Sequence, residues 1–173
     1  KLWMVSTTGT RSTVGDWSSL YGMFRVGSDS IVAWDGVARQ ARLFSHAGRP
    51  RGSISVRPLK DVVRPNGTSG RPALLLHGRL GDGSLLGRLR DPYRDGRTNH
   101  VDNDSMWIVQ VDKKGVVSPI TTLFGAQRVL YRGTTSGVDE TIPYGRVGAI
   151  LATTNGFLFS DGSDFRIEDR AAN

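Results

Sequence analysis

The chain consists of short apolar runs, and turn-forming residues bound each of them. Runs of four to six residues, such as 30–34, 41–44, 73–76 and 157–160, end at Gly, Asp, Asn, Ser or Pro. Such runs are typical of β-strands, and the 3.6-residue apolar stripe of an amphipathic helix is scarce. Only 18–24 and 121–130 have room for a turn or two of helix. The sequence therefore predicts an all-β fold.

The composition supports many tight turns in one globular unit. Glycine accounts for 22 of the 173 residues, with no Gly-X-Y period, and Gly between apolar runs favours tight turns. We expect a single β-domain over 1–173, with long loops near 63–72 and 91–105. The chain has no Cys, which excludes disulfides and thiol catalysis. No apolar stretch approaches the roughly 20 residues of a membrane span.

Three segments share a layout of strand, Asp-containing turn and strand. Residues 29–35 form an apolar run between two Asp, followed by Arg42-Leu43-Phe44 and Gly48. Residues 155–167 repeat this layout, with Asp161, Asp164 and Arg166 in the later part. Residues 106–117 read as a hairpin that turns at Asp112. These segments resemble blades of bacterial six-bladed β-propellers related to NHL-repeat proteins.

The resemblance implies an array of short antiparallel four-stranded blades, and an extracytoplasmic or secreted location. At about 40–50 residues per repeat, 173 residues supply three to four blades. We therefore expect a fragment of a larger propeller, or an open set of blades that self-associates. The alternative architecture is a β-sandwich or barrel, which has similar strand spacing. In the blade reading, structural turn roles fall on Asp35, Asp112, Asp161, Asp164 and Arg166.

Two groups of polar residues are candidates for binding. Arg and Tyr are favoured at interface hot spots, and such residues gather at Arg90, Tyr93, Arg94, Arg97 and His100. Asp102 and Asp104 follow closely and offer oxygen ligands of the kind that calcium prefers, although the favoured interpretation of this segment is a solvated loop. Calcium is the one cofactor that the sequence leaves open; otherwise none is expected.

The sequence favours binding over catalysis. Residues 72–78 resemble the strand and His-Gly turn of α/β-hydrolases, but the Gly-x-Ser-x-Gly nucleophile turn of that class is missing. We expect a non-catalytic binding or scaffold module whose loops recognise a protein or carbohydrate. One alternative, implied by the resemblance, is a metal-dependent hydrolase of the lactonase type. Another, suggested by the net charge of +7, is arginine-mediated binding of a polyanion such as nucleic acid.

Overall fold

The computed structural model describes residues 2–5, 11–59, 62–63, 69–70, 72–90, 101–132, 137–141, 148–162 and 168–171. Side chains are described for 15–59, 72–89, 105–127, 148–162 and 170–171. This part of the chain is all-β, as predicted, and contains no helix that could cross a membrane.

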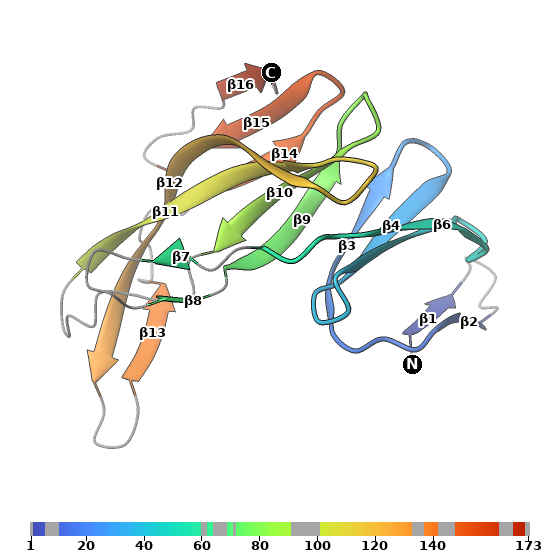
Figure 1. Cartoon of the computed structure of the whole chain (residues 1–173), viewed down its shortest axis with the longest axis horizontal. Coiled ribbons are helices and arrows are strands. Elements are labelled where there is room, and N and C mark those ends of the chain that lie inside the picture. The colour runs from blue at the N-terminus through green and yellow to red at the C-terminus, as the bar shows by residue number, and fades with distance from the viewer. Residues whose placement is uncertain are drawn as a thin grey trace.

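Three antiparallel sheets follow one another along the chain, and in each sheet the strands stand in chain order (Figure 1). The first sheet consists of β3 (Leu20–Val26), β4 (Ser30–Asp35), β5 (Gln40–Ser45) and β6 (Pro50–Ser55). The central sheet consists of β9 (Ala73–Arg79), β10 (Leu85–Arg90), β11 (Val101–Val111), β12 (Val117–Arg132) and β13 (Gly137–Thr141). The third sheet consists of β14 (Ala149–Ala152), β15 (Gly156–Ser160) and β16 (Glu168–Ala171).

Two small hairpins complete the described strands. The first pairs β1 (Leu2–Val5) with β2 (Arg11–Gly15), and the second pairs β7 (Val62–Val63) with β8 (Ser69–Gly70). The second hairpin overlaps the segment 63–72 that the sequence predicts to be a long loop.

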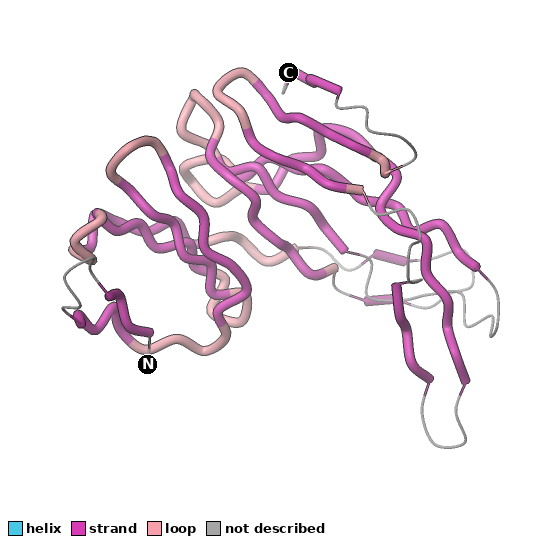
Figure 2. The backbone as a smooth tube through the Cα atoms, turned by 180° about the vertical axis from the view of Figure 1, so that it is seen from behind, coloured by secondary structure: helices cyan, strands magenta, loops and turns pink. Residues whose placement is uncertain are grey.

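Two faces of the central sheet are buried against its neighbours. We call the contact between the first and central sheets the first seam; its core is formed by Val32, Trp34, Ala41, Val56, Leu74, Leu76, Leu85, Val109 and Val111. The second seam joins the central and third sheets around Leu80, Leu86, Met106, Ile108, Phe157 and Phe159. The first strands of neighbouring sheets also touch, β3 with β9 and β9 with β14. Figure 2 shows the same order of sheets from behind.

The long strands of the central sheet correct two predictions. Residues 121–130, where a turn of helix had room, lie inside β12, because they pair with β11 over Val101–Ile108 and with β13 at their end. The predicted loop 91–105 ends early for the same reason, since 101–105 already belong to β11. Residues 20–24, the second place with room for a helical turn, form most of strand β3 because they pair with β4.

Sheet size departs from the four strands expected of each blade. The first sheet has four, whereas the described residues give the central sheet five and the third sheet three. The extra strand β13 pairs only with residues 128–132 of β12, where β12 leaves the body of the sheet (Figure 1). The other four strands of the central sheet form the unit that packs between the neighbouring sheets.

Candidate binding site

A cavity of about 180 Å³ opens at one end of the first seam, and we call it the head pocket. It lies between the β4–β5 turn and the start of β9. Aromatic, cationic and apolar residues line it: Tyr21, Trp34, Gly36, Arg39, Val56, Arg57, Leu59, Pro72, Ala73 and Leu74.

Three contacts fix the walls of the head pocket. The buried indole Nε1 of Trp34 donates to the carbonyl oxygen of Leu74 at 2.9 Å, which ties the first sheet to the central sheet. The ring of Tyr21 lies directly on Gly36, where a Cβ would overlap it. The Val56 amide donates to the Arg39 carbonyl at 2.8 Å and thereby holds the end of the β4–β5 turn.

Arg39 is the unusual residue of this pocket. Its φ of 51° is in the left-handed region, where a residue with a Cβ is uncommon. Its Nη1 atom is buried and has no hydrogen-bond partner among the residues that the structure describes. A buried donor without a partner is unfavourable, more so when it carries charge. An oxyanion in the head pocket would supply the missing acceptor.

A second cavity, the seam groove, adjoins the head pocket. Its volume is about 380 Å³, and apart from Arg57 its lining is apolar: Pro58, Leu59, Pro72, Leu89, Val109, Val116, Val117 and Pro119. Arg57, Leu59 and Pro72 line both cavities. The amide of Arg57 donates to the Gly115 carbonyl at 2.9 Å, so this shared wall is fixed to the β11–β12 turn.

A third cavity, of about 200 Å³, lies at the β9–β10 end of the same seam. Arg79 and Lys113 line it, and both side chains reach the space beside Gly83. The three cavities together are lined by the cations Arg39, Arg57, Arg79 and Lys113, and none of the described residues that line them is Asp or Glu. The first seam is therefore electrostatically suited to an acidic ligand.

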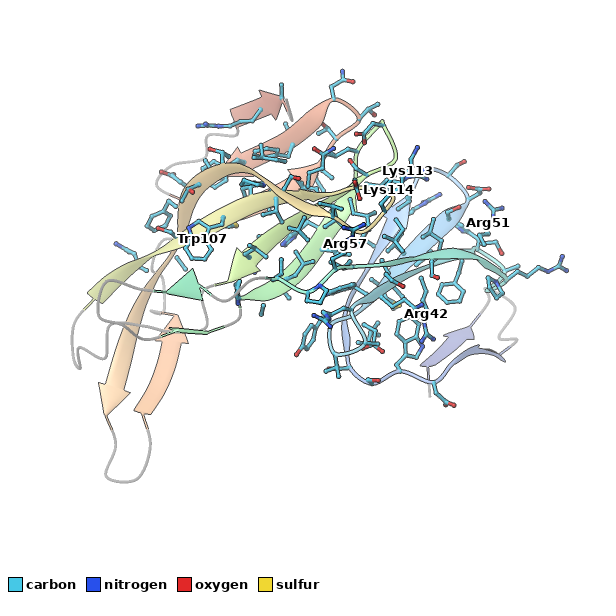
Figure 3. The ribbon with its side chains drawn as sticks, viewed as in Figure 1. Arg42, Arg51, Arg57, Trp107, Lys113 and Lys114 are labelled. Carbon is cyan, nitrogen blue, oxygen red and sulfur yellow. The ribbon has the colours of Figure 1, made fainter. Side chains whose placement is uncertain are left out.

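Other arginines of the first sheet already have partners. The Arg42 guanidinium lies 4.6 Å from the centre of the Trp17 ring and donates to Gln40. Arg51 forms an ion pair with Asp29 at 2.6 Å. Figure 3 shows Arg57 on the segment between the two sheets, beside Lys113 and Lys114, with Arg42 and Arg51 farther out on the first sheet. Within the described side chains, neither Arg39 nor Arg57 forms an ion pair.

Two of the predicted turn residues cap turns through their carboxylates. Asp35 is fully buried and accepts the amides of Ala38, Ser18 and Ser19 at 2.9, 2.8 and 3.2 Å. Burial opposes its ionisation, but these hydrogen bonds outweigh the burial and lower the pKa of Asp35 below its ordinary value. Asp112 accepts the amides of Lys114 and Val116, each at 2.8 Å. Asp161 is half-buried after β15, whereas Asp164 and Arg166 lie outside the described residues.

The side chains of the predicted binding and metal residues lie outside the described set. Tyr93, Arg94, Arg97 and His100 lie outside the described residues. Arg90 ends β10, and Asp102 and Asp104 belong to β11, but their side chains are outside the described set. The described side chains contain no cluster of three His, Asp or Glu able to hold a metal ion.

His77 lies away from the head pocket, on β9. Burial, together with the charge of Arg88, lowers its pKa to about 4, so the imidazole is neutral near pH 7. Its Nε2 atom is buried, and no described residue forms a hydrogen bond with it.

The head pocket is not predicted by the sequence, because its residues come from four separate segments. The one local signal is the pair Arg57-Pro58, which stands between the apolar residues Val56 and Leu59 after a strand. Comparison of the chain with protein-family models, with curated proteins and with solved structures finds no match.

Proposed function

We propose that this chain is a non-catalytic binding module in which serial, propeller-like sheets hold an acidic ligand at the first seam. The observation that carries the proposal is the buried Nη1 of Arg39, which has no acceptor among the described residues, in a cavity whose described lining contains a second arginine and no carboxylate. Hydrogen bonds between a guanidinium and an oxyanion are charge-assisted and are stronger than neutral ones.

Two further observations support the same function. The chain places Arg39 in a left-handed conformation, a costly arrangement of the kind that gathers at ligand sites. The Trp34–Leu74 hydrogen bond and the Val56–Arg39 hydrogen bond hold the pocket walls before any ligand arrives. Such preorganisation favours affinity, because less order must be imposed on binding.

The serial sheets also support the propeller-like part of the proposal. Each sheet is a meander in chain order, and neighbouring sheets pack face to face with their first strands in contact. The relation to NHL-repeat proteins and the extracytoplasmic location remain predictions of the sequence.

The test uses acetate as the probe and the indole N–H signal of Trp34 as the readout, in two-dimensional nitrogen–proton NMR. We expect acetate to shift this signal saturably, because Trp34 lines the pocket. Arg39→Asn, in which Asn tolerates the left-handed backbone, is expected to weaken binding about tenfold or more. Arg51→Gln, which removes an arginine paired elsewhere, is the matched control and should leave the affinity unchanged.

The dependence of affinity on salt concentration distinguishes a ligand with a single acidic group from a polyanion. A ligand that contacts two cations loses affinity only gently with salt, whereas a polyanion that contacts many loses it steeply. Absence of any acetate-dependent shift, or an equal shift in Arg39→Asn, would contradict the proposal.

A further inference from the structure

The head pocket and the seam groove are neighbouring cavities with different linings. Arg57, Leu59 and Pro72 line both cavities, so a ligand held at Arg57 borders the seam groove as well as the head pocket. The cationic groups stand at one end, Arg39 within the head pocket and Arg57 at the junction. Beyond the junction the described lining is apolar.

The wall between the two cavities is held rigidly. Hydrogen bonds from Val56 to Arg39 and from Arg57 to Gly115 fix the segment after β6 at two successive residues. Leu59 then packs against the core of the first seam. Gly115 permits this close approach, because a Cβ there would overlap the Ser55 carbonyl oxygen. The distance from the cations to the apolar groove is therefore set by the fold.

The groove is large enough for a chain of several carbons. An apolar cavity of about 150 Å³ accommodates benzene, and the seam groove measures about 380 Å³. Pro58 and Pro119 are exposed, so the groove reaches the surface and a ligand can enter from solvent. Water against this lining finds few polar partners, and an apolar chain that replaces it gains the burial free energy.

We propose that the ligand is a dissolved acid with an unbranched apolar chain, whose oxyanion binds Arg39 and Arg57 and whose chain lies in the seam groove. This inference rests on the proposed function, because it assigns the class of ligand to the same site. Charge complementarity selects the head group, and the position of Arg57 in the linings of both cavities selects an apolar chain attached to it.

The experiment measures dissociation constants for acetate, butanoate, hexanoate and octanoate by calorimetry, below micelle-forming concentrations. We expect each added CH₂ to tighten binding by about two- to fourfold until the groove is filled. The variant Val117→Thr places a hydroxyl in the groove at nearly unchanged volume and should lower the octanoate-to-acetate affinity ratio several-fold. Val37→Thr, on the exposed β4–β5 turn, is the matched control and should leave the ratio unchanged.

The outcomes separate this inference from the proposed function. Acetate binding that depends on Arg39, with no gain along the series, would overturn the apolar-chain inference and leave the acidic site standing. No Arg39-dependent binding of acetate or of any longer acid would overturn both. Octanoate affinity that is equal in wild type and Arg39→Asn, or binding only to vesicles of anionic phospholipid, would also overturn the inference.

Discussion

The central sheet packs against a neighbour on each face, and the two seams differ in the cavities that border them. Backbone hydrogen bonds cross both seams: at the first, Arg57 donates to Gly115, and at the second, Gly81 donates to the Thr154 carbonyl at 2.9 Å and Gly148 donates to Gly125. Phe157 is fully buried there. At the first seam the sheets share an apolar core. The head pocket, the seam groove and the third cavity, which Arg79 and Lys113 line, lie at the margins of this core.

This difference assigns stability to one face of the central sheet and ligand recognition to the other. A seam filled by large aromatic side chains and close backbone contacts stabilises the fold, because such interiors leave little unfilled volume. A seam that keeps an arginine buried without an acceptor loses stability there, and this loss is typical of sites that await a ligand. Four measurements test this account of the two seams and of the buried groups in the first and central sheets.

The largest effect is expected from Phe157→Ala at the second seam. Removal of this fully buried ring should lower the free energy of unfolding by about 3–5 kcal/mol. Val117→Ala, in the lining of the first-seam groove, should cost only about 1 kcal/mol, since its side chain is half-buried. Urea unfolding of both variants checks the contrast, and equal losses would contradict it.

Gly78→Ala should also destabilise the second seam, by about 1–3 kcal/mol. A Cβ on Gly78 would overlap the Cβ of Ala152 on β14. Adding Ala152→Gly should recover most of the loss in a double-mutant cycle. Gly22→Ala on β3 is the matched control, because a Cβ there meets nothing within 4 Å. A loss that Ala152→Gly does not reduce would show that the strain lies elsewhere.

The lowered pKa of His77 should make the free energy of unfolding depend on pH. Its pKa is about 4 in the folded state and near 6.5 when unfolded. The unfolded chain therefore binds the proton first as pH falls, and stability present above pH 6.5 is lost progressively down to about pH 4. The loss should be on the order of 2–3 kcal/mol. Unfolding free energies across this pH range measure it. His77→Leu should flatten the curve, whereas His46→Gln, on an exposed turn, should not.

The smallest expected effect on stability comes from Arg39→Asn. Removing the buried guanidinium and easing the left-handed backbone should raise the unfolding free energy of the ligand-free protein by roughly 0.5–1 kcal/mol. The same change should weaken acid binding, so stability and affinity move in opposite directions. Thermal unfolding with and without octanoate measures both. Destabilisation of the ligand-free variant would mean that Arg39 serves the fold and not the site.

Local patterns predicted the fold class and several turns, because those features depend on neighbouring residues. The short apolar runs at 30–34 and 106–111 predicted strands that the structure contains within β4 and β11. The spacing of one aromatic residue per strand pair predicts that Trp34, Phe44, Trp107 and Phe159 fill the space between sheets. In the structure Trp34, Phe44 and Phe159 are buried and Trp107 is half-buried. The strand over 121–130 was missed, since its pairing with β11 overrides a weak local preference.

The candidate site was not predictable in the same way. Tyr21, Arg39, Arg57 and Leu74 are far apart in sequence and meet only because two sheets pack face to face. The left-handed backbone of Arg39 also has no signal in residue type, since Gly or Asn usually takes that conformation. Sequence reasoning placed binding on the arginines of 90–97, where charge is dense, whereas the described site uses few cations in a shaped cavity.

The most direct test of the difference between the seams is a nitrogen–proton NMR titration of the assigned protein with octanoate. We expect saturable shifts at the Trp34 indole and at the amides of Arg39, Val56 and Arg57. The amide signals of Gly78, Gly81 and Phe157 should not shift. Shifts centred on the second seam, or spread evenly over both, would contradict the assignment of recognition to the first seam.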